Sequence, residues 1–183
     1  YGKPKLALLL SAMRHYAAEL SIRGFDVDYR RAATFIEGLR AHIAERRPDR
    51  AAELRAKYGG EVIGNVEAVE KADTVVLVVK PQDMGAVVDE IAGSVKPGAL
   101  VVSLAAGITT EFLEQRLPAG TPVVRVMPNT PALVDQGMAA ISPGAHCDDE
   151  HLAHAESLLS AVGKVVQVAE KHQDAVTAIS GSG

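Results

Sequence analysis

Three short stretches hold the side chains whose types and spacing could bind a polar ligand. They read KPQD from residue 80, AAGIT from residue 105 and NTPALVDQG from residue 129, and each follows an apolar run. Small residues let the backbone approach a ligand closely, and proline holds a turn rigid. Taken singly, Lys-Pro and Ala-Ala-Gly favour ordinary turns, because loops generally need such residues.

The third stretch is the most specific of the three. Pro128 and Pro131 fix φ on either side of Asn129 and Thr130. One amide and one hydroxyl are then held rigidly, which suits the positioning of a polar ligand. A stiff loop in which Asn129 bonds to its own backbone explains the pattern equally well.

A second group of chemically able residues runs from His146 to His154 and reads HCDDEHLAH. Histidine, cysteine and carboxylate side chains are common metal ligands. The same letters also fit the start of a helix, with Asp148 or Asp149 as the N-cap and acidic residues in the first turn. We predict the helix start and no metal site.

The elements that must position these residues alternate between strand and helix patterns. Apolar or alternating runs predict strands at residues 6–10, 25–29, 61–63, 74–79, 99–105, 122–128, 138–142 and 164–169. Helical patterns lie at residues 13–23, 35–58, 65–70, 83–91, 110–116, 150–162 and 173–180. This alternation predicts a single α/β domain over residues 1–183, with a doubly wound, mostly parallel, Rossmann-like sheet. Ligands bind such sheets beyond the carboxyl ends of the strands, where the three stretches lie.

The bulk composition is that of a globular domain. The chain has 183 residues, 48% of them hydrophobic and 23% charged, with a formal net charge of −4. This charge offers no basic field for nucleic acid or for anionic lipid. A single cysteine, Cys147, leaves no intramolecular disulfide, and no signal peptide or membrane-spanning run is evident. We expect a cytoplasmic domain that binds neither nucleic acid nor membrane.

Residues from about 48 to 183 resemble pyrroline-5-carboxylate reductase. The matching stretches are ADTVVLVVKPQDM, VVSLAAGIT, VRVMPNTPALVDQGMAAISPG and DAVTAISGSG, in the order and spacing of that family. The last two are specific, whereas the first two also occur in related dinucleotide-dependent reductases. The family reduces 1-pyrroline-5-carboxylate to L-proline with NADPH or NADH. The resemblance therefore implies this small-molecule substrate and NADP or NAD as the cofactor.

The resemblance also implies a cofactor site and a substrate site. The adenosine and ribose side of the cofactor would be lined by Asn65, Val78, Val79, Lys80 and Pro81. Its nicotinamide half would be approached by Ala105, Ala106 and Gly107. The place where nicotinamide meets substrate would hold Asn129 and Thr130. The loop that receives the substrate carboxylate would open with Ser180, Gly181 and Ser182, through hydroxyls and backbone N–H groups. No catalytic residue is assigned, because the family pattern supports no general acid in this chain.

The chain departs from the family pattern at its beginning. The family starts with a glycine-rich turn that lets the backbone approach the pyrophosphate, and here the corresponding place reads Ser11-Ala12-Met13-Arg14. Residues 3–46 instead resemble photolyase-related proteins through the run LSAMRHYAAEL. We predict a chimera in which residues 1–47 form an atypical, foreign first βαβ unit that binds pyrophosphate poorly.

A second departure concerns the other end of the chain. The family continues past SGSG into a helical domain that makes a dimer and completes the substrate pocket. We expect that domain to be absent, so that this chain is an incomplete or impaired reductase. A non-catalytic hybrid α/β module with neither parental activity remains an alternative. Another imine or β-hydroxyacid reductase is a further one, although the pairing of MPNTP with SGSG disfavours it.

Overall fold

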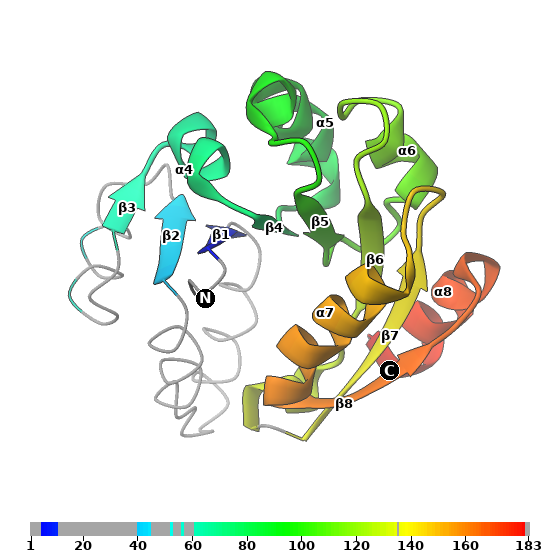
Figure 1. Cartoon of the computed structure of the whole chain (residues 1–183). Helices are drawn as coiled ribbons and strands as arrows, with labels where there is room; N and C mark the ends of the chain where they lie inside the picture. Colours follow the sequence, from blue (N-terminus) through cyan, green and yellow to red (C-terminus); the bar gives the residue numbers. More distant parts are fainter. Residues whose placement is uncertain are drawn as a thin grey trace.

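One twisted sheet organises the chain (Figure 1). The computed structural model describes residues 5–10, 40–44, 52, 56, 61–134 and 136–181. Within these ranges the strands are β1 (Lys5–Leu10), β2 (Arg40–Ala44), β3 (Glu61–Ile63), β4 (Thr74–Val78), β5 (Leu100–Ser103), β6 (Val123–Met127), β7 (Gly137–Pro143) and β8 (Gly163–Gln167). They lie in the order β3-β2-β1-β4-β5-β6-β7-β8. All neighbours are parallel except β6 and β7. The order and the parallel pairing confirm the Rossmann-like prediction.

Helices cover both faces of this sheet. The α-helices are α4 (Asn65–Lys71), α5 (Pro81–Ile91), α6 (Thr110–Glu114), α7 (Asp149–Leu159) and α8 (Gln173–Val176). Figure 1 shows α4, α5 and α6 on one side of the sheet and α7 on the other. Tighter 3-10 turns are η1 (Ala92–Ser94), η2 (Thr130–Val134), η3 (Ser160–Val162) and η4 (Glu170–His172), and η5 (Thr177–Gly181) is a π-helical turn.

The apolar patterns explain why these layers pack. In β4, Val75 and Leu77 join the core under α4 and α5, whereas Val76 and Val78 join the core under α7. A strand that alternates in this way between two covered faces reads as a continuous apolar run, as TVVLV does. Each fully buried side chain of this size contributes about 1.5–3 kcal/mol to folding.

One predicted helix is partly wrong. The pattern of residues 35–58 was expected to be helical, but Arg40–Ala44 forms β2, in parallel register between β1 and β3. A five-residue segment can satisfy either period, and pairing with two neighbouring strands decides its structure. The expected helix at 13–23, the expected strand at 25–29 and the Ser11–Arg14 turn lie outside the described residues.

The start of α7 confirms the predicted helix cap. Asp148 is the N-cap: its Oδ1 accepts a hydrogen bond from the backbone N–H of His151 at 2.9 Å. His151 Nδ1 accepts in return from the backbone N–H of Asp148 at 3.2 Å. The hydrogen bond from His151 lowers the pKa of the Asp148 carboxyl. Among the described residues, no group of three or more histidine, cysteine or acidic side chains is placed to hold a metal ion.

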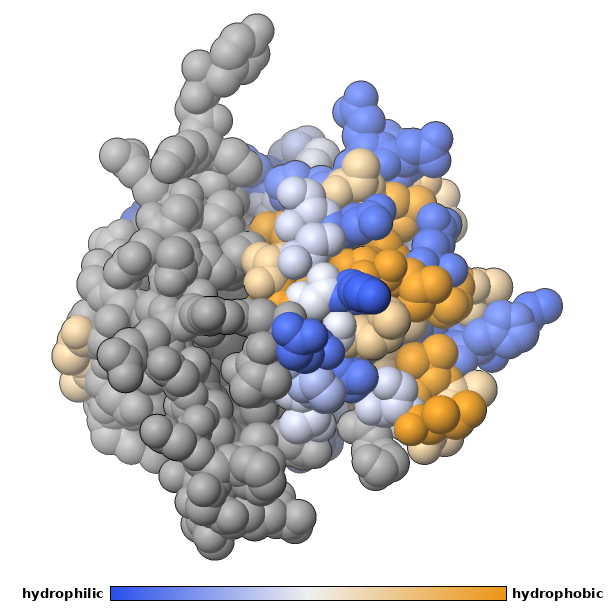
Figure 2. All heavy atoms as spheres, turned by 90° about the horizontal axis from the view of Figure 1, so that it is seen from below, coloured by the Kyte–Doolittle hydropathy of each residue, from blue (hydrophilic) through white to orange (hydrophobic). Residues whose placement is uncertain are grey.

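The surface of the described part is mixed in character. Figure 2 shows apolar and polar residues side by side on the lower face. The exposed large hydrophobic side chains are Val66, Met138, Val166 and Ile179. Within the described ranges, none of the helices combines the length and the apolar composition needed to cross a bilayer.

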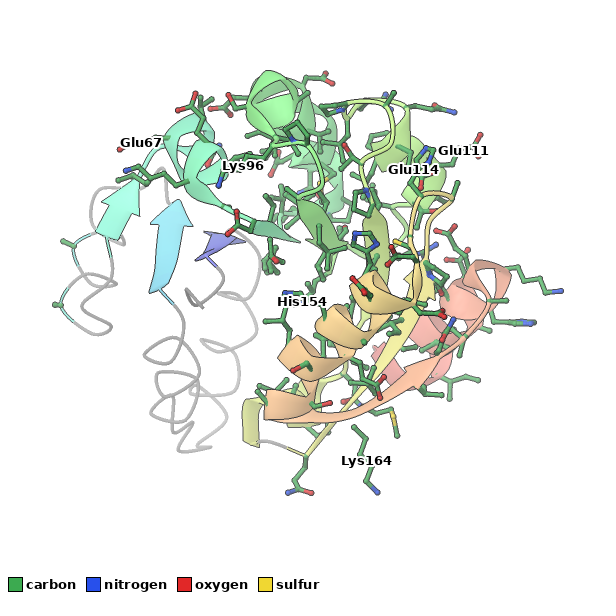
Figure 3. All side chains as sticks on the ribbon, viewed as in Figure 1. Glu67, Lys96, Glu111, Glu114, His154 and Lys164 are labelled. Carbon is green, nitrogen blue, oxygen red and sulfur yellow. The ribbon has the colours of Figure 1, made fainter. Side chains whose placement is uncertain are left out.

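His154 should make stability depend on pH. It projects from α7 toward β4 (Figure 3), with Nε2 3.1 Å from Thr74 Oγ1. Burial, and secondly the charge of His151, lower the pKa of His154 below the ordinary value. As the pH falls through about 6.5, the unfolded chain therefore binds a proton before the folded chain does. The free energy of unfolding should then decrease until the pH passes the lower, folded pKa.

Urea denaturation from about pH 7.5 to about pH 5.5 checks this expectation. The wild-type chain should lose stability across this range, and the variant His154→Gln should lose less. The matched variant His146→Gln changes an exposed histidine in the turn before α7 and should follow the wild type. Parallel curves for the wild type and His154→Gln would contradict the assignment.

Candidate functional site

The three predicted stretches meet at one edge of the sheet. β4, β5 and β6 are adjacent and parallel, so their carboxyl ends lie together. Lys80 follows β4 and is the N-cap of α5, with Pro81 in the first helical position. Gly107 lies in the turn after β5, and Asn129 lies just after β6. Sequence stretches separated by more than twenty residues are thereby brought to a common edge.

The turn after β5 combines a fixed start with an open tip. The backbone N–H of Leu104 donates to Leu77 O in β4 at 3.0 Å, which ties the start of the turn to the neighbouring strand. Gly107 has φ +74°, a conformation that residues with a side chain rarely adopt. Among the described residues, no atom lies within 4 Å of the position that a Cβ would take there. The tip therefore presents bare backbone that no described residue covers at this point.

Asn129 joins the turn after β6 to the end of the described chain. Its Oδ1 accepts a hydrogen bond from the backbone N–H of Met138 at 2.8 Å. Its Nδ2 donates to Ser180 Oγ at 3.1 Å. The amide thus bonds to the backbone of β7 across its loop, rather than to its own backbone, and also meets Ser180 of the SGSG stretch.

Three other predicted cofactor residues differ in burial and in their position along the sheet. Val78 and Val79 bury their side chains in the two cores, so only their backbone can face a ligand. Asn65 begins α4, and its Nδ2 donates to Glu90 Oε2 of α5 at 3.0 Å. Because β3 is separated from β4 by β2 and β1, Asn65 lies farther along the sheet than the three turns.

The remaining predicted residues that the structure describes lie in the turn after β5, in η2 and in η5. Ala105 is buried and Ala106 exposed in the turn after β5, and Thr130 begins η2 directly after Asn129. Gly181 closes η5, and Ser182 lies outside the described residues. The ligand-binding roles of all these residues stay predictions.

An ionic network around a buried arginine beside the site escaped the sequence analysis. Arg125 lies in β6 with only 5% of its side chain exposed, and its two terminal nitrogens reach Glu170 Oε1 at 3.4 Å and Asp174 Oδ1 at 2.9 Å. Glu170 also accepts from Thr110, through the backbone N–H at 2.8 Å and the hydroxyl at 2.7 Å. The signal was present in PVVRVMP: a charged side chain inside an apolar strand must be paired when it is buried.

A second anchor holds α8 against the sheet. Gln173 is fully buried, and its Nε2 donates to Ala140 O at 3.1 Å and to Ser142 Oγ at 2.9 Å, both in β7. Together with the Arg125 network, this anchor fixes the segment that carries Ser180.

Two family models match parts of the chain. Residues 32–107 match the family described as NADP oxidoreductase coenzyme F420-dependent. Residues 1–58 match the family described as deoxyribodipyrimidine photo-lyase-related protein. The two matches overlap, and the first begins before residue 48, where the sequence analysis placed the boundary.

Two curated relatives with extensive sequence similarity are both pyrroline-5-carboxylate reductases. The chain is 48% identical over 162 residues to a pyrroline-5-carboxylate reductase of Pseudomonas aeruginosa, covering 83% of this chain and 59% of that protein. It is 45% identical over 144 residues to the Corynebacterium melassecola enzyme, covering 76% of this chain and 53% of that protein. The chain thus spans about half the length of the curated relatives it matches.

Solved structures agree in fold. A pyrroline-5-carboxylate reductase from Coxiella burnetii superposes with a TM-score of 0.81 at 27% identity, over 100% of this chain and 65% of that chain. A Plasmodium falciparum pyrroline carboxylate reductase with NADP bound gives 0.76 at 20% identity, over 98% of this chain and 63% of that chain, a likeness of fold alone. Over about three quarters of its length or more, the chain is therefore similar in sequence to about half of a pyrroline-5-carboxylate reductase.

Proposed function

We propose that this chain carries the dinucleotide-binding part of an NAD(P)H-dependent reductase that converts 1-pyrroline-5-carboxylate to L-proline. Bound NADPH or NADH would supply a hydride to the imine carbon, and the ring nitrogen would take a proton. The chain itself would bind the cofactor along the edge formed by the ends of β4, β5 and β6. It would receive the substrate where Asn129 and Ser180 meet.

The hydrogen bond between Asn129 and Ser180 is the observation that carries this proposal. The two residues lie 51 positions apart and come from the two stretches that are most specific for the family. Their amide and hydroxyl lie beside the carboxyl ends of the central strands, where open α/β sheets bind ligands. A stiff loop alone explains the bond to Met138, but it gives no reason for the bond to Ser180.

The residues present fit a dinucleotide on one side of the site. The bare backbone of the Gly107 turn allows close approach, since a Cβ there would project into space that no described residue fills. The buried side chains of Val78 and Val79 fix the backbone before α5. The fit of the pyrophosphate depends on residues 11–14, which lie outside the described ranges. We retain the proposal that residues 1–47 are of foreign origin and bind pyrophosphate weakly.

An activity assay tests the proposal directly. We expect oxidation of NADPH or NADH only when 1-pyrroline-5-carboxylate is present, at a rate below that of a full-length reductase assayed in parallel. Chromatography should identify L-proline as the product. Oxidation of NADPH or NADH with the carbonyl compound that corresponds to a β-hydroxyacid, but not with 1-pyrroline-5-carboxylate, would favour a β-hydroxyacid reductase.

The non-catalytic hybrid module makes a different prediction. Such a chain would show no turnover with any of these substrates, while calorimetry could still detect binding of the dinucleotide. A dissociation constant for NADPH in the micromolar range or below would contradict the expected weak pyrophosphate site. Absence of both turnover and binding would contradict the proposed function itself.

A further inference from the structure

The Glu170 side chain contacts the first residue of α6 and the buried arginine of β6. One carboxylate oxygen accepts from the backbone N–H of Thr110 at 2.8 Å and lies 3.4 Å from Arg125 Nη1. The other accepts from the Thr110 hydroxyl at 2.7 Å. Thr110 is the first residue of α6 and ends the turn that contains Gly107. Glu170 itself begins η4, which leads through α8 to Ser180.

The chemistry of these contacts favours a firm connection. A carboxylate at the N-terminus of a helix is stabilised by the unpaired N–H groups and by the helix dipole. Arg125 is buried, so its charge must be paired, and Glu170 and Asp174 supply the two partners. One side chain therefore links the turn after β5, the strand β6 and the segment from residue 170 to residue 181.

We propose that Glu170 is a positioning residue that sets the spacing between the Gly107 turn and Ser180. It acts through Thr110 on one side and through its own backbone in η4 on the other. This spacing would bring nicotinamide and substrate together, and that purpose rests on the proposed function. The linkage itself does not, and it can be measured in the ligand-free protein.

Amide hydrogen exchange of the ligand-free chain tests the linkage. The variant Glu170→Ala should raise exchange about tenfold or more in two separate segments, residues 104–112 and residues 175–181. Thr110→Val, which removes only the hydroxyl arm, should raise exchange in both segments to a smaller extent. Glu170→Gln keeps the acceptor for the Thr110 N–H and should restore part of the protection in both.

Thr109→Ala is the matched control. Thr109 Oγ1 accepts from the backbone N–H of Phe112 at 3.1 Å and caps the same end of α6, but this bond does not involve the segment from residue 170. Its loss should raise exchange in α6 and leave residues 175–181 unchanged. A purely structural role of Glu170 in its own helix would loosen residues 170–176 alone, and that result would overturn the inference.

Other results also decide the question. If Thr109→Ala loosens residues 175–181 as much as Glu170→Ala does, general destabilisation explains the effect and the positioning role is wrong. Titrating the same proteins with NADPH and with L-proline separates the two proposals. A wild type that binds neither ligand contradicts the proposed function, whereas the exchange pattern still decides for or against the linkage.

Discussion

Replacing Gly163 with alanine should lower the free energy of unfolding by about 4 kcal/mol. Gly163 opens β8 with φ 154° and ψ −157°, a region that residues with a side chain hardly enter. A Cβ there would fall against the carbonyl of Gly137 and 2.6 Å from Gly137 Cα. The obstacle is backbone and cannot rotate away. Because domains of this size are stable by only about 5–15 kcal/mol, the loss should be plain in urea denaturation.

Gly120→Ala is the control that separates conformation from crowding. Gly120 also has a positive φ, +84°, but in the part of the chain that the structure describes a Cβ there would meet no atom within 4 Å. The free energy of unfolding of this variant should fall by only about 1–2 kcal/mol, because an alanine is held in the left-handed conformation. Equal losses for Gly163→Ala and Gly120→Ala would contradict the proposed clash between β7 and β8.

The close contact between Gly163 and Gly137 helps to position Asn129 in the candidate site. Gly137 pairs with Gly163 in register, and a Cβ on Gly137 would lie 2.8 Å from Ala132 of η2. The next residue, Met138, donates its backbone N–H to Asn129. The two glycines thus let η2, β7 and β8 approach closely enough to hold the Asn129 amide in place.

Replacing Asn129 with alanine should have the largest effect on ligand binding. It removes the bond to Ser180 and leaves the Met138 N–H without its acceptor. The free energy of unfolding should fall by about 2 kcal/mol. Loss of the positioned amide and displacement of Ser180 should weaken the binding of L-proline about 100-fold, since small misplacements of binding groups have effects of this order. Titrations followed by NMR measure the affinity, and urea denaturation measures the stability.

Asn129→Asp distinguishes a ligand role from a role in the loop. A carboxylate still accepts from the Met138 N–H and can accept from the Ser180 hydroxyl, so stability should stay close to that of the wild type. It also places a negative charge where the substrate carboxylate is expected, so L-proline binding should be lost. Gln115→Ala changes an exposed amide on the surface near α6 and should alter neither property. An Asn129→Asp variant that binds L-proline normally would contradict the proposed substrate site.

The buried strands and the start of α7 could be predicted from sequence, because their local residue patterns agree with the contacts that they make in the fold. TVVLV and LVVS are buried on both faces, as continuous apolar runs in a parallel sheet must be. Asp148 caps α7 because a short acceptor side chain before a helical pattern satisfies an orphan N–H. In each case the residues that give the signal also form the contact.

The strand β2, the partners of Arg125 and the contact between Asn129 and Ser180 depend on segments that are distant in the sequence. Local residue patterns do not identify such contacts. RAHIA forms β2 because β1 and β3 pair with it, not because of its own periodicity. The partners of Arg125 lie 45 and 49 residues away, so the strand pattern could indicate a need for partners but not identify them. The motif MPNTP predicted a rigid amide, whereas only the folded chain reveals that this amide meets Ser180.

The central claim is that the turns after β4, β5 and β6 form one dinucleotide-binding edge. Titration of the isotope-labelled chain with NADPH, followed by two-dimensional NMR, tests it even when binding is weak. We predict concentration-dependent shifts for the backbone amides of Lys80, Ala106 and Gly107 and for the side-chain amide of Asn129, all with one dissociation constant. Shifts confined to other parts of the chain, such as β8, or no shifts at millimolar NADPH, would contradict the account.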